Sequence, residues 1–323
     1  MAAILVIRLR FLGLERRRQR FLAVWRPLFT QALYQLPANA PHVRGGERFL
    51  FLLLFNHFHS LVKGEEEKER LNAFAVQEGL PPFAMATVHR GNLPMRIAAA
   101  QALGFLKETS AFEALEALAR VESTALSLAA ASAVTHVNPP RAMRELMPML
   151  TARPDWPPSA CERMLLDAGQ AAASGPLKEA VMAAGEDTAP TLLRYLHTAA
   201  EETAAECARF WLTRARSPET LSAALQSLKD PRLRPMAREY LAHPVWHVRT
   251  QAVKALGRIG DQGDAPYLIR ALTDKEWWVR YRAARTLAEA PFVDHAAFTA
   301  IREAQTDRYA REALDRAAAE TGK

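Results

Sequence analysis

Apolar side chains recur along much of the chain at the spacing of a helix that packs on one face. In the clearest segment, positions i, i+4, i+8 and i+11 of one helical face are held by Val248, Ala252, Leu256 and Ile259. A turn is expected at 261–264, and the apolar face of the next helix is formed by Tyr267, Leu268, Ala271 and Leu272. Pro266 suits the first turn of that helix, because the N–H that proline lacks would have no partner there. The pattern predicts a pair of helices joined by a short turn.

This pair of helices recurs with a period of 31 residues. At this offset, segment 243–257 matches segment 274–288 at five positions, namely Trp246 with Trp277, Val248 with Val279, Arg249 with Arg280, Ala252 with Ala283, and Leu256 with Leu287. Further upstream, the same period relates Leu103, Val134 and Leu165. A period of this length indicates stacked repeats, in which each helical pair buries its apolar face against the next. We expect the array to run from about Leu80 to Glu320, with a degenerate middle.

The repeated strings resemble the HEAT-repeat family, in the short variety found in phycobilisome bilin lyases and in many bacterial scaffold proteins. The resemblance rests on Val248-Arg249-x-x-Ala252-x-x-Ala255-Leu256-Gly257, on Val279-Arg280-x-x-Ala283-Ala284-x-x-Leu287, and on the segment from Met95 to Gly104. It implies an all-α fold, an α-solenoid in which helical hairpins form a right-handed superhelix with a curved surface for partners. It does not imply lyase chemistry, because the repeat is a scaffold on which function is added separately.

Three parts are expected along the chain. Residues 1–36 form a basic N-terminal arm, residues 37–82 form capping helices, and residues 83–323 form the repeat solenoid. The apolar run at 48–62 is shorter than the roughly 20 residues needed to span a bilayer, so we expect a buried capping helix there.

Positive charge is concentrated before the repeats. Of the 42 basic and 35 acidic residues in the chain, nine arginines and only two glutamates, Glu15 and Glu47, lie within residues 1–60. This region therefore holds the whole formal net charge of +7, and the rest of the chain is neutral. A neutral array argues against a solenoid that binds nucleic acid along its length, since phosphates favour a basic surface.

The basic arm predicts contact with an anionic membrane through Arg16, Arg17, Arg18 and Arg20. An apolar start followed by arginines resembles the cytoplasmic end of a membrane anchor that would continue upstream of Met1. Otherwise the arm could lie on the membrane surface, where each arginine adds about 1 kcal/mol. The alternatives are contact with nucleic acid, and a solvated basic helix that packs one face on the end of the array. The residues of that face are Phe21, Trp25, Leu28 and Phe29.

Aromatic and arginine side chains gather in the last repeats. Arg249, Arg280 and Arg311 share one repeat phase and predict a ladder that bonds aspartate caps and turn carbonyls of adjacent units, with Trp246 and Trp277 covering the seam between repeats. The candidate partner surface consists of Trp278, Tyr281, Arg282, Arg238, Arg270 and Arg302. The last three belong to a row of arginines on the second helices, which is either a partner groove or a solvated face.

No catalytic, cofactor-binding or metal-binding residues are predicted. The pair His57 and His59 has too few partners for a metal site, and Cys161 and Cys207 are expected to be buried. Some HEAT-like proteins are alkylbase DNA glycosylases, which hold a damaged nucleotide between tryptophans beside an aspartate. Here Asp274, Trp277 and Trp278 supply those residue types, at positions where the repeat places ordinary caps and seam residues.

The predicted function is therefore a non-catalytic scaffold for protein–protein interaction, held at the cytoplasmic face of a bacterial inner membrane by its arm. It would be cytoplasmic and either peripheral to the membrane or anchored in it. A protein partner such as a membrane enzyme or an envelope-assembly factor is expected, together with an anionic membrane surface, whereas nucleic acid and cofactors are not. The alternative is a nucleic-acid-acting enzyme like the alkylbase DNA glycosylases.

Overall fold

The computed structural model describes residues 2–323 of the chain, and its side chains from Glu15 onward. All regular secondary structure in this range is helical, and it contains no strand. The prediction of an all-α fold is confirmed. The helices fall into two compact units: unit 1 is Met1–Leu146 with Asp155–Ala168, and unit 2 is Met147–Pro154 with Gly169–Lys323.

Each unit is built of helices that follow one another along the chain, apart from α9 and α10. The α-helices of unit 1 are α1 (Ala2–Ala32), α2 (Arg48–Leu61), α3 (Glu65–Gln77), α4 (Leu80–Arg90), α5 (Leu93–Phe105), α6 (Phe112–Ala119), α7 (Thr124–Val137), α8 (Pro139–Leu146) and α10 (Pro158–Ala168). Those of unit 2 are α9 (Met149–Ala152), α11 (Gln170–Ala183), α12 (Ala189–Leu193), α13 (Glu201–Arg214), α14 (Pro218–Ser227), α15 (Arg234–Glu239), α16 (Trp246–Ile259), α17 (Ala265–Ala271), α18 (Trp277–Glu289), α19 (His295–Ala304) and α20 (Arg308–Thr321).

Helix α1 is packed into unit 1 through aromatic rings. Phe21, Trp25 and Phe29 are spaced four residues apart, so they lie on one helical face, and all three are buried. The Trp25 ring meets the ring of Phe51 in α2 edge-on at 5.0 Å, and Phe29 meets Phe74 of α3 at 5.3 Å. Burying each large apolar side chain contributes about 1.5–3 kcal/mol, so this cluster holds the described part of the arm against α2 and α3.

This arrangement agrees with the alternative in which the arm is a basic helix packed through one face. Leu28, the fourth residue expected on that face, is half-buried. Helix α2 occupies 48–61 of the apolar run predicted to form a buried cap, and Phe51, Leu52 and Phe55 are buried. In the part of the chain that the structure describes, no helix is both long enough and apolar enough to cross a bilayer.

The first helices of successive repeats in unit 1 pack closely on one another. Leu103 of α5 and Val134 of α7 are fully buried, as is Leu165 of α10. Next to Leu103, Gly104 faces the backbone of Ala133, and a Cβ at position 104 would lie only 2.6 Å from the Ala133 Cα. The absence of a side chain at Gly104 therefore lets α5 and α7 approach each other.

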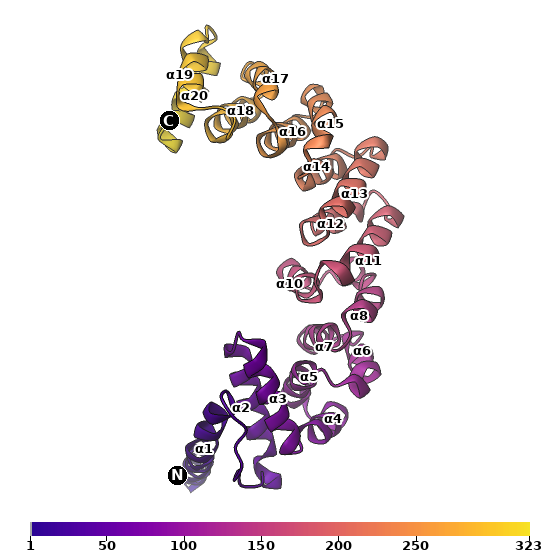
Figure 1. Cartoon of the computed structure of the whole chain (residues 1–323), viewed down its shortest axis with the longest axis vertical. Helices are drawn as coiled ribbons and strands as arrows, with labels where there is room; N and C mark the ends of the chain where they lie inside the picture. The colour runs from indigo at the N-terminus through magenta and orange to yellow at the C-terminus, as the bar shows by residue number, and fades with distance from the viewer. Residues whose placement is uncertain (1) are drawn as a thin grey trace. The chain divides into compact units, whose positions relative to one another are not determined.

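Unit 2 repeats this packing with its most regular hairpins. Figure 1 shows α16 and α18 side by side, with α17 on their edge. Leu256 and Leu287 are fully buried at equivalent positions of the two helices, and Gly257 follows Leu256 as Gly104 follows Leu103. The turn before α17 is a capping box. The Asp261 carboxylate accepts a hydrogen bond from the backbone N–H of Gly263, and the Asp264 carboxylate accepts one from the backbone N–H of Asp261.

Candidate functional site

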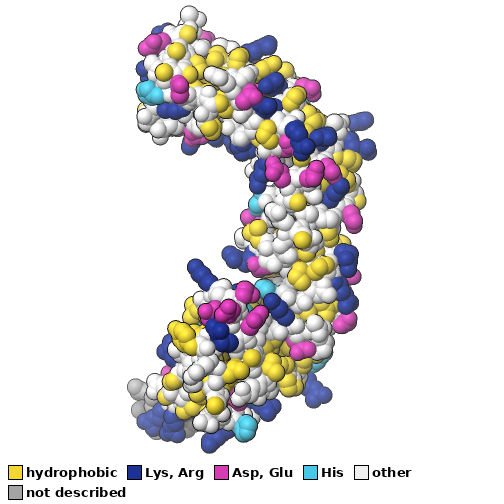
Figure 2. All heavy atoms as spheres, viewed as in Figure 1, with side chains coloured by type: hydrophobic (Ala, Val, Ile, Leu, Met, Phe, Trp, Pro, Cys, Tyr) yellow, Lys and Arg dark blue, Asp and Glu magenta, His cyan; other side chains and the backbone are white. Residues whose placement is uncertain are grey.

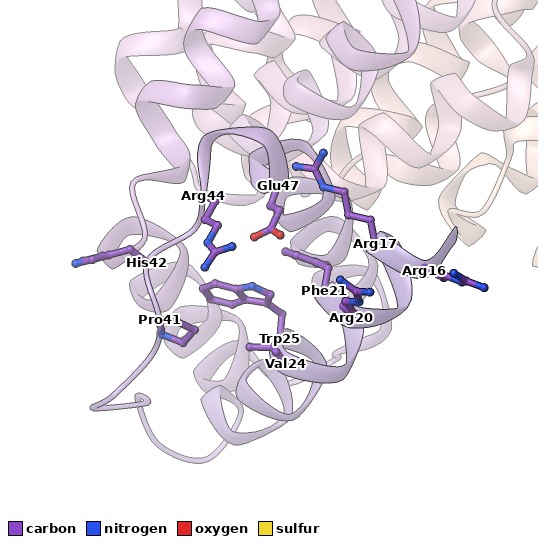
Figure 3. Close-up of a pocket in the computed structure, with 10 residues that line it drawn as sticks. All are labelled: Arg16, Arg17, Arg20, Phe21, Val24, Trp25, Pro41, His42, Arg44 and Glu47. Carbon is purple, nitrogen blue, oxygen red and sulfur yellow. The ribbon is translucent and has the colours of Figure 1, made fainter. Parts of the chain in front are cut away.

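A basic recess lies between α1 and the loop that leads into α2 (Figure 3). It encloses about 730 Å³. Helix α1 lines it with Arg16, Arg17, Arg20, Phe21, Val24 and Trp25, and the loop lines it with Pro41, His42, Arg44 and Glu47. Figure 3 shows Arg44 and Glu47 reaching from the loop toward Trp25 and Phe21, whereas Arg16 and His42 extend away from the centre. Three of the four arginines predicted for membrane contact thus border one cavity.

The recess carries an excess of positive charge. Arg16, Arg17, Arg20 and Arg44 are all exposed, and among the described residues none of them forms an ion pair with a carboxylate. Glu47 is the one acidic side chain on the wall formed by described residues. Guanidinium groups that border one recess repel one another, and an anion placed in the recess would relieve that repulsion.

The loop that carries Arg44 lies near the end of α3. Its residues His42 and Val43 are close to the Glu78 carboxyl. Burial raises the pKa of the Glu78 carboxyl, while the neighbouring His42 opposes this rise. Gly46 lies against Arg17, and a Cβ at position 46 would come within 2.4 Å of one terminal nitrogen of the Arg17 guanidinium. The loop is therefore held close to α1, so the recess is formed by packed elements on both sides.

A second concavity, the leucine hollow, lies on the other side of α1. It encloses about 410 Å³ and is lined by Arg18, Phe21, Leu22, Arg26, Leu50, Leu53, Leu54 and His57. Leu53 is 42% exposed, and Arg18, the fourth arginine predicted for membrane contact, lies 3.8 Å from Glu15 on the same helix. Figure 2 shows dark-blue Lys and Arg side chains at the end of unit 1 where α1 lies. Helix α1 thus presents arginines on both flanks, with exposed leucine beside them.

The His57 and His59 pair is divided between solvent and core. His59 is buried and stacks on the Phe105 ring at 4.2 Å with an interplanar angle of 13°. Burial, reinforced by the charge of Lys68, lowers the pKa of His59 from 6.5 to about 4. His57 is exposed. In the range that the structure describes, no group of three or more His, Cys, Asp or Glu side chains could hold a metal ion.

Both cysteines occupy packed positions within helices. Cys161 of α10 and Cys207 of α13 are buried, as the sequence predicts. Burial raises the pKa of the Cys207 thiol to about 11, which keeps it protonated and poorly nucleophilic at neutral pH.

The arginines at the shared repeat phase bond turn carbonyls, but in the turn that precedes their own helix rather than in an adjacent unit. One terminal nitrogen of Arg249 donates to the carbonyls of His243 at 2.8 Å and Pro244 at 3.0 Å, in the turn before its own helix. Arg280 donates in the same way to the carbonyl of Asp274 at 2.7 Å. Arg311 donates to the carbonyl of Gln305. This arginine ladder fastens each first helix to the turn that precedes it.

Asp274 is engaged in the ladder by both of its oxygens. The Nε and Nη2 atoms of Arg249 donate to the two carboxylate oxygens, each at 2.7 Å, and the backbone N–H of Glu276 donates to Oδ1 at 2.9 Å. The group of Asp274, Trp277 and Trp278 therefore offers no uncommitted carboxylate for glycosylase chemistry.

Exposed aromatic rings lie at the N-terminal ends of α16 and α18. Trp246, Trp277 and Trp278 are 41%, 42% and 55% exposed. The Trp277 ring stacks on that of Tyr281 at 5.2 Å with an interplanar angle of 3°, and the Arg316 guanidinium lies over both rings. These residues form an aromatic edge on unit 2. Trp246 and Trp277 are therefore part of this surface, and their covering of the seam between repeats stays a prediction.

The remaining residues of the candidate partner surface have mixed surroundings. Arg238 donates to the buried carboxylate of Asp264 and lies over the Tyr267 ring, and Arg302 lies 3.8 Å from Asp315. Tyr281 is half-buried and donates its hydroxyl hydrogen to Glu320 at 2.6 Å. The others share no single site: Arg270 is exposed and Arg282 is half-buried. The structure does not gather the six candidates into one cluster.

Sequence analysis missed the loop side of the basic recess. Arg44 and Glu47 contributed only to the charge of residues 1–60, because the loop has no helical period that would place them beside α1. Gly45 and Gly46 mark a tight backbone there, but their spacing does not show which surface the loop covers.

A family model described as HEAT repeats matches residues 190–288. None of the curated protein sequences compared with the chain matches it significantly. Among solved structures, the complex of CpcE and CpcF of phycocyanin lyase from Nostoc sp. PCC7120 is 20% identical, with a TM-score of 0.35 and coverage of 72% of this chain and 94% of that one. An engineered protein matches at 16% identity and a TM-score of 0.26, covering 75% of this chain and 96% of that one.

Human deoxyhypusine hydroxylase in complex with glycerol matches at 15% identity and a TM-score of 0.26, covering 96% of this chain and 99% of that one. The matched segment 190–288 contains α16 and nearly all of α18, whose strings carry the resemblance drawn from the sequence. Residues 190–288 therefore match the HEAT-repeat family, in agreement with the resemblance drawn from the sequence.

Proposed function

We propose that this protein is a non-catalytic scaffold that adsorbs to an anionic membrane surface through α1 and binds a protein partner through its repeats. One observation carries the membrane part of the proposal. Helix α1 buries Phe21, Trp25 and Phe29, while its arginines stay exposed on both flanks beside the leucine hollow. The helix is thus fixed by its aromatic face, and its basic side chains are left for another partner.

The electrostatic contribution can be judged from the arginines of α1. Each basic side chain near an anionic bilayer is worth about 1 kcal/mol, and the attraction fades within a Debye length of about 8–10 Å. Five exposed arginines with described side chains, at 16, 17, 18, 20 and 26, would give up to about 5 kcal/mol if all reached the surface. Insertion of Leu53 would add an apolar term.

The protein-binding part of the proposal rests on the repeats and on the aromatic edge. Stacked helical hairpins provide a long surface for partners. Tryptophan, tyrosine and arginine are the residues in which interface energy is concentrated, and Trp278 is the most exposed tryptophan of the edge. A membrane enzyme or an envelope-assembly factor would be brought to the bilayer by such a scaffold, in the cytoplasm of a bacterium.

A non-catalytic role is supported by the side chains best suited to catalysis, because each of them is already bound to another part of the protein. Asp274 is bound by Arg249, and the Asp264 carboxylate is buried against Arg238. His59 is stacked in the core. These groups stabilise turns and packing, so a binding role accounts for them without a reaction.

Flotation of the full chain with vesicles tests the membrane proposal. Exchanging Arg18 and Arg20 for Glu should weaken binding to anionic vesicles by about a hundredfold or more, because the four units of charge removed are worth roughly 1 kcal/mol each. The matched control exchanges Arg163 and Arg209 for Glu, which makes the same change in net charge on α10 and α13. Both variants should melt like the unsubstituted chain. Equal weakening in the two variants, or no flotation of the unsubstituted chain, would refute the proposal.

A further inference from the structure

We infer that the basic recess is a specific site for a phosphate-bearing group that also carries hydroxyl groups, such as a phosphoglycerol. The inference deepens the proposed membrane function, because a phosphoglycerol headgroup is one source of this chemistry and a soluble phosphoester is the other. It rests on the shape, charge and rigidity of the recess.

The recess has the size of a ligand site. Its volume of about 730 Å³ falls within the range of about 300–1,000 Å³ that is usual for small-molecule pockets. It is larger than a bare phosphate needs, so it can accept the groups attached to one. A flat basic helix would attract anions, but it would have no opposing wall to select among them.

The arginines surround the cavity from two elements. Arg17 and Arg20 come from α1, and Arg44 comes from the loop and is directed toward Trp25 (Figure 3). A guanidinium presents a planar fork of donors that matches two phosphate oxygens. Because no carboxylate of the described residues pairs with these arginines, their donors can turn to a ligand without breaking an existing ion pair.

Glu47 determines the second feature of the ligand. Its side chain reaches into the recess beside the arginines (Figure 3). The Glu47 carboxylate would repel inorganic phosphate. In a larger ligand it can accept hydrogen bonds from hydroxyl groups next to the phosphate group. The combination of several arginines and one glutamate therefore favours a phosphate with neighbouring hydroxyls over inorganic phosphate.

The walls are held in place before any ligand binds. Phe21 and Trp25 are buried, and Trp25 meets Phe51 edge-on. On the loop side, Gly46 lies against the Arg17 guanidinium. A site formed in advance loses less conformational entropy on binding than a flexible one.

The test compares two single substitutions in the full chain, Arg44→Gln and Arg26→Gln. Both remove one exposed arginine of unit 1, but Arg44 lines the recess and Arg26 lies in the leucine hollow. In calorimetric titration with glycerol 3-phosphate, Arg44→Gln should weaken binding at least tenfold and Arg26→Gln should leave it unchanged. With Glu47→Gln, the preference for glycerol 3-phosphate over inorganic phosphate should disappear.

A second arm measures binding to phosphatidylcholine vesicles that contain phosphatidylglycerol. The loss of any one surface arginine should weaken vesicle binding about fivefold, and Arg26→Gln should show only this effect. Arg44→Gln should weaken vesicle binding tenfold or more. Equal effects on vesicles, with no binding of glycerol 3-phosphate, would overturn the specific site and leave the proposed membrane function standing. Failure of the unsubstituted chain to bind vesicles would overturn the membrane function. In that case, binding of glycerol 3-phosphate that Arg44→Gln weakens would assign the recess to a soluble phosphoester. If glycerol 3-phosphate did not bind, the recess would be overturned as a ligand site as well.

Discussion

Replacing Arg249 by Met should destabilise unit 2 far more than its single charge suggests. The side chain of Arg249 is 6% exposed and that of its partner Asp274 is 13% exposed. The substitution keeps the aliphatic stem but removes the bidentate contact with Asp274 and the donors to the carbonyls of His243 and Pro244. It leaves a largely buried carboxylate that keeps its hydrogen bond from the backbone N–H of Glu276.

Breaking a buried ion pair from one side costs about 3–5 kcal/mol, because the other charge stays desolvated without its partner. The residual exposure of Asp274 lets water reach it, so we expect the lower end, about 3 kcal/mol. For a unit of this size, each kcal/mol lowers Tm by about 2–4 °C, which predicts a shift of roughly 6–12 °C.

The assay is thermal unfolding followed by circular dichroism, with Arg285→Met as the matched control. Arg285 pairs with Glu289 one turn away on α18, at 40% and 48% side-chain exposure. Such an exposed pair is worth about 0.3–0.5 kcal/mol, so the control should shift Tm by about 1–2 °C. The double variant Arg249→Met with Asp274→Asn should be less destabilised than the sum of its single substitutions. Equal shifts for Arg249→Met and the control would refute the assignment of Arg249 to a buried ladder.

Three further substitutions test the packing. Leu256→Asp places a charge in the stack of α16 and α18 and should abolish the cooperative unfolding of unit 2 in urea; an unchanged transition would contradict the assigned face. Gly104→Ala should cost about 1–3 kcal/mol through its clash with the α7 backbone, while Gly175→Ala, where a Cβ meets nothing within 4 Å, should be neutral or stabilising by up to about 1 kcal/mol. Similar urea midpoints for the two alanine variants would count against the close approach of α5 and α7. Because the pKa of His59 falls from 6.5 unfolded to about 4 folded, protons bind the unfolded chain first, and stability is lost as pH drops from 6.5 toward 4. His59→Phe should reduce that loss, and an identical pH profile would show that the ring is not desolvated.

The sequence was sufficient to predict the helical repeats, because their packing is periodic. Leu103, Val134 and Leu165 hold the same position on the apolar face of successive hairpins, and all three are fully buried. Gly257 was expected to end its helix, but it lies within α16, where a Cβ would come within 2.6 Å of the Thr286 side chain of α18.

The surroundings of the N-terminal arm could not be derived in the same way. A helix with Phe21, Trp25 and Phe29 on one face and arginines on the other fits both a packed helix and one that lies on a bilayer. Only the tertiary contacts with Phe51 and Phe74 show where the aromatic face is buried.

The basic recess depends on a contact between two segments that no local pattern links. Arg44 lies in an irregular loop, and its distance along the chain from Arg17 and Arg20 gives no indication that all three border one cavity. The exposure of Trp277 was equally hidden, because its repeat phase fixes its position at the start of α18 but not how far the next helix covers it.

Hydrogen–deuterium exchange of the full chain with and without anionic vesicles tests membrane adsorption through α1 most directly. Exchange should be slower in the vesicle-bound chain at α1 and at the loop of 41–47, with no change at α16, α18 and α20. Protection that falls on the aromatic edge of unit 2 instead, or an exchange pattern that vesicles leave unaltered, would contradict adsorption through α1.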